Sequence, residues 1–348
     1  MLVITNRTVL SGHADESAFS AKFVPSSDAL AMADVTRAGS PHWSLTNVTP
    51  AVSDAAAEAA LVTVFEGDRP VLVHLHGNSM TPGQCFERCA RFEEVFGVAV
   101  VGFSWPSEGL LPSGKHRKGV TGARAEAEDR WTLASVTSTN FDARTGGVAD
   151  VIARYRQSKR NGKSAVAALA RFLVRVGNAH ACARTPQPFS IAAHSLGVHC
   201  LEMLLEAGLG PRLPKARNIA LLAGCVPHRN HARWISKLPR SDALIVTTNI
   251  SDLVLLGALW ADKFQAKVGA SVPVPPLVVD PKTRYVDFSR RSFGKHEYFI
   301  AEQDKTLDPD LLAVFKRVFA SADDIPAGDD PCAVYRGCCD AGPLVCLT

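Results

Sequence analysis

The feature that most constrains the fold is an alternation of short, uninterrupted apolar runs with longer stretches of helical periodicity. The apolar runs cover residues 69–77, 97–106, 188–194, 218–225 and 243–249. Continuous apolar runs of this length are typical of strands that are buried on both faces, as in a parallel sheet. The sequence therefore predicts an α/β fold with a mostly parallel central sheet and helices on both faces.

The stretches between the runs carry helix signals. Thr81-Pro82 offers an N-cap followed by a first-turn proline, and apolar residues then recur at helical spacing. We expect further helices over 148–177 (with a break near Gly162), 196–208, 253–268 and 308–322, and two more strands over 276–280 and 284–288.

Three regions are expected along the chain. Residues 1–66 form an N-terminal segment with one strand, near Leu2–Thr5, that joins the core, and a loop rich in Ser, Thr and Ala. Residues 67–321 form one α/β core, in which the polar stretch at about 107–147 is an insertion or lid. Residues 322–348 form a cysteine-containing tail.

Charge and composition exclude several classes of protein. A formal net charge of +4 is too small to indicate a nucleic-acid partner. No apolar run is long enough to span a membrane, since the longest candidate, 244–260, contains Asn249 and Asp252. The nine cysteines are an odd number and no export signal precedes them, so we expect reduced thiols and a cytoplasmic location.

A serine stands where the third apolar run ends and a helix begins. Ala193-His194-Ser195-Leu196-Gly197 matches the nucleophile elbow Gly-x-Ser-x-Gly, with alanine in place of the first glycine. The helix N-terminus favours negative charge that develops at the serine. The pattern predicts Ser195 as a nucleophile; the alternative is a serine that only caps the helix.

The first apolar run ends in His74-Leu75-His76-Gly77-Asn78. An acyl-transfer site needs two N–H donors for its oxyanion, and we expect them at Leu196 and Asn78, with Gly77 allowing a tight turn. His-x-His is also typical of zinc sites, but later strand ends offer no convincing further ligands, so we expect no metal. Trp105, at the end of the second run, either lines the acyl pocket or packs in the core.

The general base is expected late in the chain. Of the eleven histidines, His296 is the best placed, because it follows the last strand patterns in a loop that Gly294 opens. His228 and His231 lie in a polar segment and are expected at the surface, and His194 is expected to pack against the sheet.

The acid is expected between the serine and the histidine. Asp252 stands just past the run 243–249, where a carboxylate would hold the tautomer of the imidazole. The alternative role of Asp252 is to cap the following helix. Asp280 and Asp287 also follow apolar residues and are the alternative acids.

Several of these segments together resemble a known family. VLVHLHGNSMT (71–81), VVGFSWPSEG (100–109), IAAHSLGVHCLE (191–202) and TTNISDLVL (247–255) resemble an uncharacterised, mostly bacterial branch of the α/β-hydrolase superfamily, and VITNR near the start resembles its first strand. The resemblance covers about 68–106 and 148–300 and implies an α/β-hydrolase fold with Ser195, Asp252 and His296 at the matching motifs. Asn78 stands where the family usually has an aromatic residue, and the stretch 107–147 has no counterpart, so the resemblance implies no particular substrate.

These features point to one reaction and leave two alternatives. The order Ser195, Asp252, His296 is that of α/β-hydrolases, so we expect a serine hydrolase that cleaves a small carboxylic ester without a cofactor. One alternative is a catalytically silent scaffold that binds a ligand or a protein. The other is an enzyme that acts on lipids, because residues 154–163 carry five basic side chains that suit anionic head groups. No oligomeric state is predicted.

Overall fold

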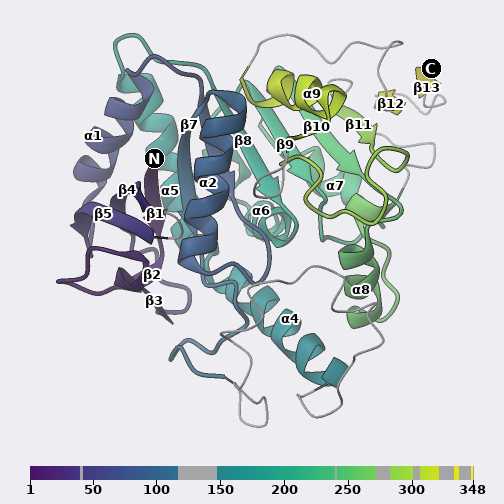
Figure 1. The fold of residues 1–348 in the computed structure, drawn as a ribbon, viewed down its shortest axis with the longest axis horizontal. Helices are drawn as coiled ribbons and strands as arrows, with labels where there is room; N and C mark the ends of the chain where they lie inside the picture. Colours follow the sequence, from purple (N-terminus) through teal and green to yellow (C-terminus); the bar gives the residue numbers. More distant parts are fainter. Residues whose placement is uncertain are drawn as a thin grey trace.

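The computed structural model describes residues 1–39, 42–116, 147–239, 241–271, 283–300, 306–320, 333–336 and 346–347. Within these residues the chain forms an α/β structure, in which helices flank a large and mostly parallel sheet (Figure 1). The α/β class with a mostly parallel central sheet, predicted from the alternating apolar runs, is confirmed.

Parallel strands form the centre of the sheet. In spatial order the described ones are β11 (Thr283–Asp287), β10 (Ala243–Thr248), β9 (Asn218–Leu222), β8 (Phe189–His194), β6 (Val71–Leu75), β7 (Ala99–Ser104) and β1 (Leu2–Thr5). Every residue of β6, β8 and β9 is buried, as expected of strands covered on both faces. Their carboxyl ends meet at one edge of the sheet, where the sites of such folds lie.

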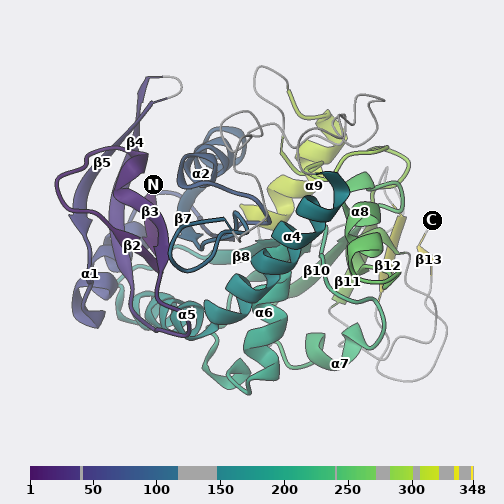
Figure 2. The same cartoon turned by 90° about the horizontal axis from the view of Figure 1, so that it is seen from below.

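Helices form a layer on each side of this sheet. Figure 2 shows α2 (Pro82–Phe96) and α9 (Pro309–Phe319) on one face, and α1 (Asp54–Phe65), α5 (Val166–Cys182) and α6 (Leu196–Glu206) on the other. The remaining helices of the described residues are α4 (Gly147–Ser164), α7 (His231–Ile235) and α8 (Leu253–Ala261), with short 3₁₀ turns at Glu16–Ala18, Gly210–Arg212 and Val268–Ala270. Helix α4 packs on α6 and α8.

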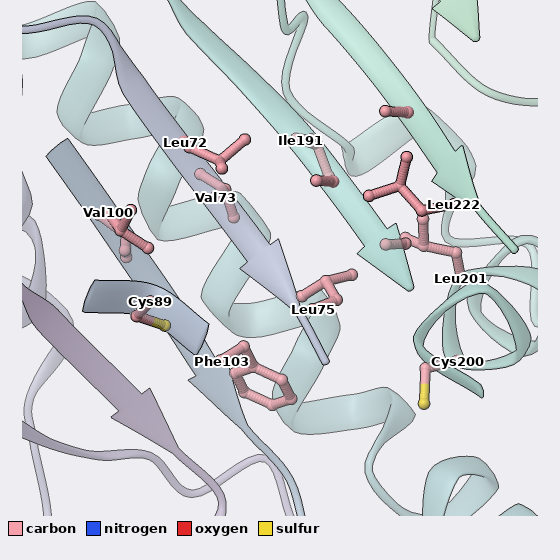
Figure 3. Packing of buried hydrophobic residues seen from close by; sticks show 14 of the residues in the cluster. Leu72, Val73, Leu75, Cys89, Val100, Phe103, Ile191, Cys200, Leu201 and Leu222 are labelled. Carbon is pink, nitrogen blue, oxygen red and sulfur yellow. The ribbon is translucent and has the colours of Figure 1, made fainter. Parts of the chain in front are cut away.

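The core is closely packed. Figure 3 shows side chains of β6 (Leu72, Val73, Leu75) beside Phe103 of β7 and Ile191 of β8. Helix α2 lies so close to β7 that a Cβ added at Gly102 would come within 2.7 Å of the Cys89 sulfur. Both Cys85 and Cys89 are buried here as free thiols, on one face of α2.

The N-terminal segment corrects one prediction. The described residues of 1–66 form five strands and helix α1, not a single strand. Strands β4 (Ala31–Gly39) and β5 (His42–Thr49) extend the main sheet antiparallel to β1, and β2 (Arg7–Val9) pairs with β3 (Phe19–Phe23). The apolar face of β4 is built largely from alanine, which has a weak strand preference, so pairing with β1 decides its structure rather than local sequence.

Two helix predictions and the tail prediction also change. The helix expected over 148–177 does break, at Ala165 rather than near Gly162, and the one expected over 253–268 ends at Ala261. The predicted strand 276–280 and most of the predicted insertion, 117–146, lie outside the described residues. Within the tail, β12 (Ala333–Arg336) and β13 (Cys346–Leu347) extend the sheet beyond β11, because the edge of β11 offers unpaired backbone groups.

No helix in the described part of the chain is both long enough and apolar enough to cross a membrane. The apolar run 244–260 instead divides between β10 and α8.

Candidate active site

Ser195 occupies a strained turn between β8 and α6. Its φ of 51° and ψ of −113° lie in a region that residues with a side chain rarely adopt. Such strain costs about 1–3 kcal/mol and persists only where the surroundings enforce it. Here Gly197 lets α6 approach β6 very closely, because a Cβ at this position would come within 2.4 Å of the Leu75 carbonyl oxygen.

Asp252 and His296 are in direct contact. The Nδ1–H of His296 donates to Oδ2 of Asp252 at 2.6 Å, which leaves Nε2 as the basic nitrogen of the ring. Asp252 is fully buried, and its other oxygen, Oδ1, accepts from the backbone N–H of Leu255 at 3.0 Å. Both roles weighed from the sequence are therefore compatible, since one carboxylate oxygen caps α8 and the other contacts the histidine.

The surroundings of His296 raise its pKa. Burial lowers its pKa, but the Asp252 carboxylate, through its charge and its hydrogen bond, and the nearby Glu297 raise it, and the net pKa lies above the usual imidazole value. The ring of His194 lies 4.7 Å from that of His296, centroid to centroid, which places the base beside the residue preceding Ser195.

The loop that carries His296 is held from two sides. The Nδ2 of Asn249, a fully buried side chain at the end of β10, donates to the carbonyl oxygens of Ser292 (2.7 Å) and Lys295 (2.8 Å). On the other side, Glu297 pairs with Arg88 of α2. These contacts join the loop both to the strand that precedes Asp252 and to the helix that follows the Asn78 loop.

Gly77 lies against the serine. A Cβ added at Gly77 would come within 3.0 Å of both the Ser195 Cβ and the His194 Nδ1. Asn78 follows at once, and its Oδ1 is buried without a hydrogen-bond partner among the described residues. Leu196 opens α6, so its backbone N–H belongs to the first turn, where no intrahelical acceptor exists. The segments expected to supply the oxyanion donors thus converge on Ser195.

His76 and Trp105 form a packed pair behind this loop. The Trp105 backbone N–H donates to His76 Nε2 at 3.1 Å, its indole N–H donates to the His76 carbonyl at 2.9 Å, and the two rings stack. Trp105 is 1% exposed. Of the two roles expected for Trp105, the structure shows core packing, and a role in the acyl pocket stays a prediction.

A buried arginine that the sequence reading missed cross-links the same loops. Arg7 forms two bonds to Glu108 (2.6 and 2.8 Å) and also donates to the carbonyl oxygens of Trp105 (2.8 Å) and Met80 (3.3 Å). Ser107 adds a second link, because its hydroxyl accepts from the Met80 N–H at 2.9 Å. A charged residue after a short strand is usually expected at the surface. The resemblance of VITNR to a family strand includes Arg7 but gives it no role.

Burial lowers the pKa of other histidines near the sheet. Burial, with a further effect of nearby Arg88, lowers the pKa of His74 to about 3, and it also lowers the pKa of His194 far below its usual value. His231 is buried and bonds to the Tyr285 hydroxyl at 2.8 Å, so the surface position expected for it is wrong. His228, expected at the surface with it, is half-buried.

Of the alternative acids, Asp287 is hydrogen-bonded within its own turn. The Asp287 carboxylate accepts from the backbone N–H of Ser289 at 3.0 Å, and Asp280 lies outside the described residues. Among the described residues no group of three or more His, Cys, Asp or Glu side chains is arranged to hold a metal ion. A hollow of about 350 Å³ between α5 and the turn at Gly210–Arg212 contains none of the predicted site residues.

Comparison of the chain with protein-family models, with curated proteins and with solved structures finds no match. The site must therefore be interpreted from its own geometry.

Proposed function

We propose that this protein is a serine hydrolase of the α/β-hydrolase type that cleaves a carboxylic ester. The observation that carries the proposal is that one sheet holds both a strained serine, at φ 51° between β8 and α6, and a buried Asp252–His296 contact at 2.6 Å. Three strand ends of one parallel sheet supply these groups, and a strained nucleophile turn with an acid-oriented imidazole is the arrangement that activates a serine.

In the proposed mechanism, the Ser195 hydroxyl attacks the ester carbonyl while His296 Nε2 takes its proton. Asp252 holds the ring through Nδ1 and stabilises the imidazolium that forms. The backbone N–H groups of Leu196 and Asn78 bind the oxyanion. His296 then returns the proton to the leaving alcohol, and a water molecule, deprotonated by the same histidine, releases the acid and regenerates Ser195.

The test is covalent labelling with a fluorophosphonate probe, mapped by mass spectrometry. We expect the label on Ser195 and its loss in Ser195→Ala and His296→Ala. Ser190→Ala is the matched control, because Ser190 is a buried serine of the same strand, β8. An unlabelled wild-type protein with a cooperative unfolding transition would contradict the proposal and favour the ligand-binding scaffold.

A further inference from the structure

Large exposed apolar side chains gather around α8. Of the seven in the described part of the chain, five belong to residues 250–293: Ile250, Leu256, Trp260, Phe264 and Phe293, which we call the α8 surface. Trp260, Phe264 and Phe293 are 66%, 64% and 82% exposed. The remaining two, Leu10 and Val24, lie in the N-terminal segment. Aromatic side chains that are exposed together mark a surface that contacts something other than water.

These side chains form a continuous stripe. Leu253, Leu256 and Trp260 lie three and four residues apart and so share one face of α8. The rings of Trp260 and Phe264 are 4.6 Å apart, centroid to centroid. At the other end, a Cβ at Gly294, next to Phe293, would lie 3.3 Å from Leu253. The stripe therefore runs from the His296 loop along the length of α8.

The stripe borders the candidate active site. Helix α8 begins at Asp252, whose carboxylate caps it and contacts His296, and Phe293 lies three residues before His296. Figure 2 shows α8 beside α4, and Arg156 of α4 donates to the Ala261 carbonyl at 3.0 Å. One end of the stripe thus lies next to the Asp252–His296 pair, and Trp260 and Phe264 lie at the opposite end of α8.

Exposed cations outnumber exposed acids in the segments next to this stripe, although one of the cations, Arg291, pairs with Asp310 at 3.2 Å. Within residues 149–164, 250–271 and 288–300, none of the four acidic side chains is exposed, whereas these cations are: Arg156, Arg160, Lys163, Lys263, Arg290, Arg291 and Lys295. The acids are mostly neutralised internally. Asp252 contacts His296, Asp262 pairs with Lys159 and Lys267, and Glu297 pairs with Arg88. The exposed part of these segments is therefore apolar and positively charged.

We propose that the α8 surface docks on an anionic lipid layer and that the ester cleaved at Ser195 is drawn from that layer. Exposed aromatic and leucine side chains enter the boundary of the acyl chains, and the surrounding lysines and arginines attract anionic head groups. A second copy of the chain fits this surface poorly, because a two-fold contact would bring its cations against the same cations of the other copy. The substrate half of this proposal rests on the proposed hydrolase function; the docking half does not.

Docking is tested on the full-length Ser195→Ala protein, so that no turnover is needed. We expect flotation with phosphatidylglycerol vesicles, weaker flotation with phosphatidylcholine vesicles, and loss of binding at raised salt. Trp260→Ser/Phe264→Ser should abolish flotation, and Lys263→Gln/Lys295→Gln should lower the partition coefficient about 30-fold, since two surface charges are removed. The matched controls are Leu10→Ser/Val24→Ser and Lys215→Gln/Lys237→Gln, which remove exposed side chains elsewhere.

Tryptophan fluorescence decides between the possible occupants. Trp260 is the exposed tryptophan of the described residues, so the difference between wild type and Trp260→Phe isolates its signal. We expect quenching by acrylamide without vesicles, and a blue shift with protection when phosphatidylglycerol vesicles are added. Protection in the absence of vesicles would overturn the proposal by showing that another part of the chain covers the stripe. A dimer that Trp260→Ser/Phe264→Ser dissociates in sedimentation would overturn it in favour of a second copy.

Activity separates the two proposals. In Trp260→Ser/Phe264→Ser, fluorophosphonate labelling of Ser195 and hydrolysis of a short water-soluble ester should stay unchanged, while hydrolysis of an ester embedded in phosphatidylglycerol vesicles should fall at least tenfold. Equal loss on both esters would contradict the lipid-layer substrate. Absence of labelling in every form would contradict the hydrolase proposal. The docking proposal would then be decided by flotation alone.

Discussion

The two sides of the candidate site are built differently. The loops on the proposed oxyanion side, Gly77–Met80 and Ser104–Glu108, are cross-linked by buried groups, above all the guanidinium of Arg7 and the hydroxyl of Ser107. On the side of Asp252 and His296, Asn249 holds the loop from inside the protein, but the neighbouring α8 surface is exposed and apolar. Backbone donors for an oxyanion act only if they are already in place, which requires a rigid setting. A surface that meets a partner instead has to remain accessible.

Breaking the acid–base side should have the largest effect on catalysis. Asp252→Asn is expected to lower kcat about 10⁴-fold, because the amide no longer holds the productive tautomer of His296. Asparagine is as good an N-cap as aspartate, so the free energy of unfolding should change little. Steady-state kinetics and urea unfolding measure the two effects.

A second cap serves as the control for that prediction. Asp308 caps α9 through the Leu311 N–H and lies outside the candidate site. Asp308→Asn should leave both kcat and stability close to those of the wild type. A comparable loss of activity in both variants would show that Asp252 acts through helix stability alone.

Breaking the oxyanion side should have the largest effect on stability. Arg7→Met leaves the Glu108 carboxylate largely buried and unpaired, which is expected to lower the free energy of unfolding by about 3–5 kcal/mol. Arg37→Met removes an ion pair with Glu87 that is about one-third exposed, and should cost less than about 1 kcal/mol. Urea unfolding of the two variants measures the difference, and equal costs would contradict the assignment of Arg7 as a buried cross-link.

Crowding the contact between the two sides should have an intermediate effect. Gly77→Ala places a methyl group 3.0 Å from the Ser195 Cβ, so we expect a loss of about 1–3 kcal/mol in stability together with reduced kcat/KM. Gly257→Ala is the counterpart in α8, where nothing lies within 4 Å of the added group, and should stabilise the protein by about 0.5–1 kcal/mol. Thermal unfolding and kcat/KM of both variants provide the test; full activity in Gly77→Ala would contradict the close contact.

The smallest expected effect is a shift in pH dependence. His296 must be neutral to take the serine proton. We therefore expect full kcat/KM at pH values above the raised pKa of His296, and a fall in kcat/KM as the pH drops through that pKa. Glu297 raises this pKa and Arg88 lowers it, so Glu297→Gln should move the acidic limb to lower pH and Arg88→Gln should move it to higher pH. Shifts in the same direction in both variants would indicate a loss of loop position rather than of charge.

Local patterns predicted much of the centre of the molecule. The strands β6 to β10, the N-cap at Thr81 and the turn at Ser195 all depend on residues close together in the chain. The sequence also proposed Asp252 and His296 for one site, and the structure brings them into contact, although their catalytic roles stay predictions. Arg7 and Asn249 were missed because their partners lie 98 and 43 residues away, and no local spacing reveals such pairings.

The sequence by itself determined the class of fold and the candidate nucleophile. Apolar periodicity and turn residues are local properties, and they set where a strand or a helix begins and ends. Only the tertiary structure decided that β4 and β5 extend the sheet, that Arg7 is buried and that an apolar stripe is exposed along α8. The sequence of an apolar helix such as α8 predicts a buried helix. Whether each of its faces is covered depends on which distant segments pack against it.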